Sequence, residues 1–276
     1  RLLLPRQRRE RAEAPVVEPV RKLVEWAFII GRRLVAREHA ARVVDQPDGR
    51  ALVARAHRVR VHPPRHLLEE GHHDAVTWAI EQGAVGGMPL TGFAFGCASN
   101  ADAFVPSPQQ FIYFQGAGFD MSFLSFLEVD REGNVNVSKL GKKPYLTAGC
   151  GGFVDITAHA KKIVFSGWFE AGAQIELTED GVKVAKPGKF TKMVETVEHV
   201  TFSGNRAREQ GQDVLYVTER CVMRLGENGL VATEIMPGID AQADIVEASE
   251  GRVAVAENAT TMPKSLLSKA PMGWAP

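Results

Sequence analysis

The sequence has few cysteines and no long hydrophobic run. Its three cysteines, Cys97, Cys150 and Cys221, show no Cys-x-x-Cys spacing. This argues against a disulfide framework or a zinc site and fits a reducing compartment. The longest nearly apolar run near the start, residues 26–30, is far too short to span a membrane. Because the Arg-rich beginning also lacks the pattern of a secretory signal, we expect a cytoplasmic protein without membrane contact.

Several common functional motifs are also missing. No Gly-x-Ser-x-Gly elbow and no readable Ser/His/Asp order occur. The stretch Gly149–Gly152 lacks the Lys-Ser/Thr of a phosphate loop and the spacing of the dinucleotide fingerprint. Six of the eight histidines lie between His39 and His73, in a spacing that fits no metal motif. We therefore expect neither a nucleotide loop nor a metal centre.

The net charge is zero, but the charges are unevenly distributed. The chain has 276 residues, 45% of them hydrophobic, which allows a sizeable core in one large domain or two modest ones. Residues 1–70 contain 15 Arg and one Lys against nine acidic residues. A basic arm can indicate nucleic-acid binding, but this segment offers a single Trp and one Phe as stacking platforms. Nothing except the Arg count favours nucleic-acid binding, and we therefore expect no nucleic-acid partner.

Apolar runs separated by turn residues predict a strand-rich α/β protein. The run Phe111–Gln115 is interpreted as extended, and Asp240 as the N-cap of a helix. Strands with flanking helices favour an α/β or α+β fold with a mixed sheet. The expected strands are residues 76–80, 121–129, 135–138, 162–168, 213–218, 221–225 and 230–235, and the expected helices are residues 155–160 and 238–249.

One carboxylate stands between a predicted buried strand and a glycine-rich turn. Glu81 follows Val76–Ile80 and precedes Gly83, Gly86 and Gly87. Glycines permit positive φ and let backbone N–H groups approach a ligand closely. In an open α/β sheet, ligands bind beyond the carboxyl ends of the strands, which makes Glu81 a candidate functional residue. A surface glutamate that opens a tight turn would show the same local pattern.

Two further glycine clusters follow apolar segments. They are Gly116 with Gly118, and Gly149–Gly152. Together with the first cluster they suggest a rim where backbone approaches a ligand, although tight connections in a compact sheet would look alike. Gly151 and Gly152 precede a possible helix start, and backbone N–H groups there could stabilise an oxyanion.

Other reactive side chains are interpreted as structural. Cys150 could be a nucleophile, but His159 is the only histidine close to it in the sequence, so a small buried cysteine is favoured. Glu128 and Asp130 flank a predicted hairpin, and Glu219 is interpreted as an ion-pair or turn residue.

Seven strings, taken in order, are similar to one known family. The resemblance is to the C-terminal half of family I CoA-transferases, of the acetate/propionate (acyl-CoA:carboxylate CoA-transferase) type. It runs from about Leu67 to the end of the chain, and it is specific because the strings keep their order. The strings are residues 76–87, 116–120, 130–138, 149–155, 200–203, 214–220 and 237–240.

The resemblance implies a fold, a reaction and a nucleophile. The family has an open α/β sheet shared with sugar-phosphate isomerases, and its catalytic glutamate lies in a Glu-x-Gly-x-x-Gly turn that matches Glu81. This carboxylate would attack an acyl-CoA thioester and pass through an acyl anhydride to a glutamyl-CoA thioester, with ping-pong kinetics. The backbone N–H of Gly152 would be the oxyanion donor.

The resemblance also implies ligands and partners. Coenzyme A would be a co-substrate beside a short-chain carboxylate, with no metal. An N-terminal half or a homo-oligomer would complete the site. The alternative is an inactive or partner-dependent fragment that acts only as a structural or interaction remnant. The residues implied in substrate or CoA binding are Gly83, Gly116, Gly118, Asn136 and Gly151.

The resemblance divides the chain into two segments. Residues 67–276 match the catalytic-glutamate domain, whereas residues 1–66 form an atypical Arg-rich segment. The family has a Gly-x-Gly-x-Pro turn just before the catalytic strand, but between residues 38 and 66 the only glycine is Gly49. The Arg, Ala, Pro and His content is typical of GC-rich DNA read out of frame. Our hypothesis is that part of this segment is a frameshifted or mis-assembled translation.

This hypothesis has a direct test. We expect one of the other two reading frames of the coding DNA to encode a glycine-rich strand and turn upstream of Leu67. Translation of all three frames checks this, and the hypothesis fails if neither alternative frame restores the motif.

Overall fold

The computed structural model describes Leu68, Gly71, residues 76–90, Ala94, and residues 96–116, 118–139 and 147–267. The segment 1–66 and its predicted frameshift lie outside these residues. Within the described ranges, no helix is long and apolar enough to cross a membrane.

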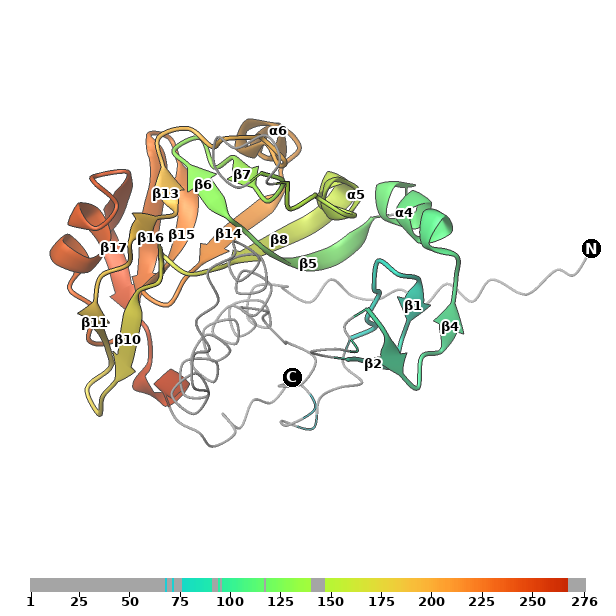
Figure 1. The fold of residues 1–276 in the computed structure, drawn as a ribbon, viewed down its shortest axis with the longest axis horizontal. Coiled ribbons are helices and arrows are strands. Elements are labelled where there is room, and N and C mark those ends of the chain that lie inside the picture. The colour runs from blue at the N-terminus through green and yellow to red at the C-terminus, as the bar shows by residue number, and fades with distance from the viewer. Residues whose placement is uncertain are drawn as a thin grey trace, which may run out of the picture.

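A six-stranded mixed sheet forms the centre of the fold (Figure 1). Its strands lie in the order β17-β16-β15-β14-β8-β5. The pairs β5/β8, β8/β14 and β16/β17 are parallel, and β15 is antiparallel to both of its neighbours. The predicted mixed α/β sheet is therefore confirmed. The strands are β5 (Phe119–Ser125), β8 (Ala160–Ser166), β14 (Asp213–Val217), β15 (Cys221–Gly226), β16 (Gly229–Ile235) and β17 (Val253–Thr261).

Both faces of this sheet are buried. Ile163 and Phe165 of β8 belong to one hydrophobic cluster, and Val164 between them belongs to the other, as the two-residue period of a strand requires. A parallel strand covered on both faces carries a continuous apolar run, and the run from Ile163 to Phe165 made β8 predictable from its sequence. The first cluster includes residues of α5 (Phe153–His159), α6 (Gly204–Glu209) and η3 (Ala241–Glu247), and the second includes residues of β10 (Gln174–Leu177), β11 (Val182–Lys186) and η4 (Lys264–Leu267).

Aromatic rings fix α5 on the sheet. Phe165 stacks on Phe153, the first residue of α5, with ring centroids 5.6 Å apart. On β14, Tyr216 stacks on Phe165 at 5.6 Å, and its hydroxyl donates to the carbonyl of Gly133 at 2.6 Å. Such aromatic pairs contribute beyond their buried area. The start of α5 is thus held by the core of the protein.

The predicted hairpin after β5 is present. Strands β6 and β7 are antiparallel, and the buried carboxylate of Asp130 accepts the backbone N–H groups of Glu132 and Asn134 in the turn. The hairpin and the remaining short strands are β6 (Glu128–Asp130), β7 (Val135–Asn136), β1 (Ala84–Val85), β2 (Met88–Pro89), β3 (Ala98–Ser99), β4 (Ala103–Phe104), β9 (Glu170–Ala171), β12 (Phe190–Thr191) and β13 (Met193–Val194).

Two predicted elements are wrong. Val76–Ile80 is not a buried strand of the central sheet; its one bridge joins Ala79 to Val85, and Val76 and Ala79 are exposed. Phe111–Gln115 is not extended but lies in the helix α4 (Ser107–Gly116). A five-residue apolar run does not distinguish a strand from a helix. Pro108 in the first turn is the available helix signal.

The helix predicted at residues 238–249 is present as η3, and Asp240 is its N-cap as predicted. In η3, whose hydrogen bonds are of the wider π type, the carboxylate of Asp240 accepts the N–H of Ala243 at 2.7 Å. A side-chain acceptor at this position satisfies one of the free donors of the first turn.

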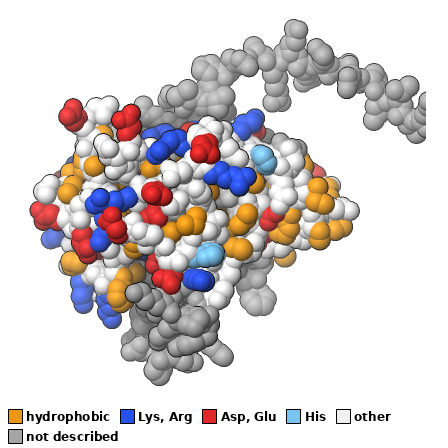
Figure 2. Space-filling view, turned by 90° about the horizontal axis from the view of Figure 1, so that it is seen from above, with side chains coloured by type: hydrophobic (Ala, Val, Ile, Leu, Met, Phe, Trp, Pro, Cys, Tyr) orange, Lys and Arg blue, Asp and Glu red, His pale blue; other side chains and the backbone are white. Residues whose placement is uncertain are grey.

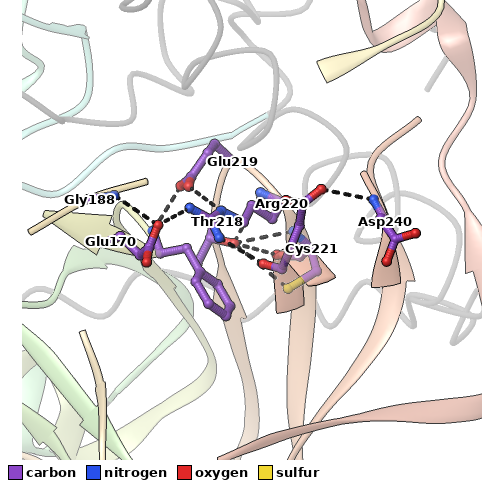
Figure 3. A network of polar contacts seen from close by, with 9 residues as sticks. Glu170, Gly188, Thr218, Glu219, Arg220, Cys221 and Asp240 are labelled. Atoms are coloured by element: carbon purple, nitrogen blue, oxygen red, sulfur yellow. Dashed lines mark hydrogen bonds and ion pairs between the residues drawn. The ribbon is translucent and has the colours of Figure 1, made fainter. Parts of the chain in front are cut away.

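A buried ion network joins the turn between β14 and β15 to its surroundings (Figure 3). The guanidinium of Arg220 pairs with Glu170 and, at 3.1 Å, with Glu219, and it donates to the carbonyl of Asp244 at 2.7 Å. Glu219 also accepts the N–H of Phe169 at 2.8 Å. Burial raises the pKa of Glu219, while the Arg220 charge and the Phe169 N–H oppose that shift. The predicted ion-pair role of Glu219 is confirmed.

Removal of the cation should cost more stability than removal of all three charges. Arg220→Met leaves two buried carboxylates without their cation, and we expect the free energy of unfolding to fall by about 3–5 kcal/mol. The triple variant Arg220→Met/Glu170→Gln/Glu219→Gln should lose less, because no buried charge stays unpaired. Urea unfolding of both variants checks this, and equal losses would contradict it.

Candidate active site

Glu81 lies at the tip of a tight hairpin. The N–H of Ile80 donates to the carbonyl of Ala84 at 2.9 Å, and the N–H of Gly83 donates to the carbonyl of Ile80 at 2.8 Å. Gly83 has a φ of 109°, and Gly86 and Gly87 also have positive φ, as expected. The Glu81 side chain is half-buried. The hairpin thus presents a carboxylate that keeps contact with water.

The hairpin is fixed to the segment that leads into α4. Strand β1 pairs with β4 in antiparallel register, and the N–H of Val105 donates to the carbonyl of Gly83 at 2.9 Å. A Cβ on Gly83 would overlap the carbonyl of Val105. This glycine is therefore needed for the close approach of two backbones.

The Glu81 carboxylate lies against the second glycine turn. A Cβ placed on Gly152 would lie 2.9 Å from Oε2 of Glu81 and would overlap the ring of Phe111. A Cβ on Gly151 would lie 3.8 Å from Oε1. The structure thus brings together Glu81, Gly151 and Gly152, which were predicted as site residues from distant parts of the sequence.

This glycine turn is held on both sides. Gly152 directly precedes α5, whose Phe153 is stacked on the sheet. On the other side, the N–H groups of Ala148 and Gly149 both donate to the carbonyl of Ser138, at 2.8 and 3.2 Å. Within the described part of the chain, no backbone carbonyl accepts the N–H of Gly152. That donor is therefore available next to a carboxylate.

One face of α4 completes the surroundings of Glu81. The hydroxyl of Ser107 donates to the Glu81 carbonyl at 3.1 Å, and Phe111 fills the space beside Gly152. One turn further on, Phe114 packs against Phe119 of β5 at 5.1 Å. Gln110 on this face is buried, and its Nε2 has no hydrogen-bond partner. The sequence interpretation missed these residues: their helical spacing indicates that they share one face of a helix, but not that this face lies at Glu81.

The other predicted binding residues do not contact Glu81. Gly118, with a φ of 66°, lets β5 start close to α5, since a Cβ there would lie 2.6 Å from the carbonyl of His159. The space beside Gly116 is open. Asn136 is buried and uses its amide within the fold, donating to Glu128 and Lys139. The binding roles of these residues and of Gly83 and Gly151 stay predictions.

Cys150 is exposed, which corrects the expectation of a buried cysteine. Burial depends on the tertiary position of the turn, which a small residue between glycines does not indicate. Cys150 and His159 lie at opposite ends of α5, a helix of about 10 Å, so they form no catalytic pair. Cys221, by contrast, is buried, and burial raises the pKa of its thiol to about 12, which makes it unreactive. Among the described residues, no cluster of His, Cys, Asp or Glu could hold a metal ion.

Comparison with known proteins gives named relatives. No protein-family model matches the chain. It is 38% identical over 228 residues to acetate CoA-transferase YdiF of Escherichia coli K12, covering 82% of this chain and 40% of that protein. It is 38% identical over 206 residues to caffeate CoA-transferase of Acetobacterium woodii, covering 74% and 39%. The match to acetate CoA-transferase YdiF is longer than the segment 67–276, so it extends upstream of residue 67.

Solved structures agree with these relatives. The fold matches the acyl-CoA transferase YdiF of Escherichia coli O157:H7 with a TM-score of 0.69 and 33% identity, covering 91% of this chain and 46% of that one. A structure of the same enzyme as a thioester complex with CoA has also been solved. The chain therefore spans less than half the length of these relatives.

A methyl group at Gly152 should be poorly tolerated for steric reasons alone. The backbone of Gly152 (φ −81°, ψ 11°) suits any residue, so Gly152→Ala adds only the overlap with Phe111 and Glu81. We expect the free energy of unfolding to fall by about 1–3 kcal/mol. Urea unfolding measures this loss. Combining Gly152→Ala with Phe111→Ala should cost less than the sum of the two single variants, and strict additivity would contradict the contact.

Proposed function

The chain resembles the C-terminal half of the family I CoA-transferases, and from this we propose that it transfers CoA between a short-chain acyl-CoA and a free carboxylate. The observation that carries the proposal is the position of the Glu81 carboxylate against the Gly151–Gly152 turn. A nucleophilic carboxylate must stay ionised and must reach its target, and half-burial at a hairpin tip allows both.

The proposed reaction consists of four nucleophilic attacks, each with its own leaving group. A carboxylate oxygen of Glu81 attacks the thioester carbonyl, the C–S bond breaks, and CoA thiolate leaves an acyl-glutamyl anhydride. The thiolate then attacks the glutamyl carbonyl of this anhydride, which releases the first carboxylate and forms a glutamyl-CoA thioester. The second carboxylate attacks that thioester and displaces CoA thiolate. The thiolate finally attacks the new acyl carbonyl, which frees Glu81.

The glycine turn would stabilise the charge that develops on oxygen. Each attack creates an oxyanion beside Glu81, and the N–H of Gly152 is the proposed donor. Loss of one such donor typically costs a few kcal/mol of transition-state stabilisation. Gly83, Gly116, Gly118, Asn136 and Gly151 are the proposed contacts for substrate and coenzyme A.

A second protein surface is proposed to complete the site. The chain covers 40% of the acetate CoA-transferase that it resembles, so an N-terminal half or another copy would supply the rest. On α4, Ile112 and Tyr113 are 69% and 48% exposed. Figure 2 shows hydrophobic side chains gathered toward the end of the molecule that carries α4 in Figure 1.

We also propose that the protein is cytoplasmic and that residues 67–276 form the catalytic-glutamate domain.

The covalent intermediate provides the test. We expect the chain, incubated with acetyl-CoA together with a candidate N-terminal half, to carry CoA on the peptide that contains Glu81. Peptide mass spectrometry detects this adduct. Glu81→Ala should abolish it, because it removes the carboxylate that lies against Gly152.

The alternative is an inactive or partner-dependent fragment with a structural role. It predicts no adduct with any short-chain acyl-CoA, with or without the added half. A CoA adduct that persists in Glu81→Ala would contradict the assignment of the nucleophile.

A further inference from the structure

The antiparallel pairing of β1 with β4 continues beyond the two strands. Ala84 is paired with Phe104 and Val85 with Ala103. Gly83 and Val105 occupy the next pair, and they are joined by the N–H of Val105 and the carbonyl of Gly83 at 2.9 Å. In an antiparallel ladder, hydrogen-bonded pairs alternate with pairs that exchange no hydrogen bond.

Beyond Gly83 and Val105 this pairing ends on both sides. Residues 81–83 form the turn of the Glu81 hairpin, and the other segment enters α4 at Ser107. At this point the hydroxyl of Ser107 donates to the Glu81 carbonyl at 3.1 Å. A side chain thus joins the hairpin tip to the first residue of the helix where the backbone pairing has ended.

The helix α4 is itself fixed to the elements that carry the glycine turn. Phe111 lies against Gly152, and Gln115 donates a hydrogen bond to Asp155 of α5. The same helix therefore contacts the Glu81 backbone at its first residue and the oxyanion turn in its middle. Any shift between α4 and the Glu81 hairpin would change the distance between the carboxylate and Gly152.

We propose that Ser107 is the positioning residue of the nucleophile: its hydroxyl fixes the Glu81 backbone to α4, and α4 fixes that backbone relative to Gly152. This proposal rests on the assignment of Glu81 as the nucleophile. Ser107 does not contact the reacting atoms. It acts by keeping the carboxylate in attack geometry, on which the rate of a covalent step depends steeply. Binding of acyl-CoA should depend on it little.

The test uses three variants of the full chain with its candidate N-terminal half. The rate of CoA attachment to Glu81 is followed over a range of acetyl-CoA concentrations. Ser107→Ala should lower the rate at saturation about tenfold and leave the half-saturating concentration unchanged. Ser107→Thr keeps a hydroxyl and should restore the rate. Gln109→Ala, an exposed change on the same helix, is the matched control and should match wild type.

Amide hydrogen exchange at residues 81–83 gives a second reading that needs no activity. Exchange there should be faster in Ser107→Ala than in Ser107→Thr. If wild type forms the adduct and Ser107→Ala forms it equally fast, the positioning role is overturned while the proposed function stands. If wild type forms no adduct, the proposed function falls. In that case amide exchange alone tests whether Ser107 fixes the Glu81 backbone. Equal exchange at residues 81–83 in Ser107→Ala and Ser107→Thr overturns this role as well.

Discussion

The arrangement of the site depends on the absence of one side chain, at Gly152. The Phe111 ring and the Glu81 carboxylate occupy the volume that a Cβ would fill. This contact joins the α4 helix, the Glu81 hairpin and the turn before α5. Since Phe153, the next residue, stacks on Phe165 of the central sheet, this contact also ties the carboxylate to the buried core of the sheet. The distance between Glu81 and a backbone N–H is thereby set by packing.

The two parts of the molecule are stabilised in different ways. The central sheet is buried on both faces, and Arg220 with its two carboxylates joins its connecting segments. The Glu81 hairpin consists of an isolated bridge from Ala79 to Val85 and the two-residue strand β1, and such a hairpin is marginal by itself. It gains its fixed position from contacts with α4 and the glycine turn. The proposed nucleophile thus lies on a marginal local structure that is oriented by more extensively packed neighbours.

The sequence predicted well what depends on local pattern. Apolar runs gave β8, β14, β15 and β16, and Asp240 correctly indicated the start of η3. Val76–Ile80 and Phe111–Gln115 were wrong because a short apolar run fits a strand or a helix, and the decision depends on partners distant in sequence. The resemblance named Glu81 and Gly152, but no pattern showed Ser107 or Phe111 near them. Their contacts exist only after α4 has packed across the hairpin.

The same geometry explains why a half-exposed carboxylate can still be precisely placed. Its backbone is fixed by hydrogen bonds on both strands of the hairpin and by Ser107, so the side chain itself need not be buried. Burial would favour the neutral acid and weaken the nucleophile. Backbone fixation with an accessible side chain avoids that cost. Under the proposed function, the accessible side of Glu81 is where an acyl-CoA and a completing protein surface would approach.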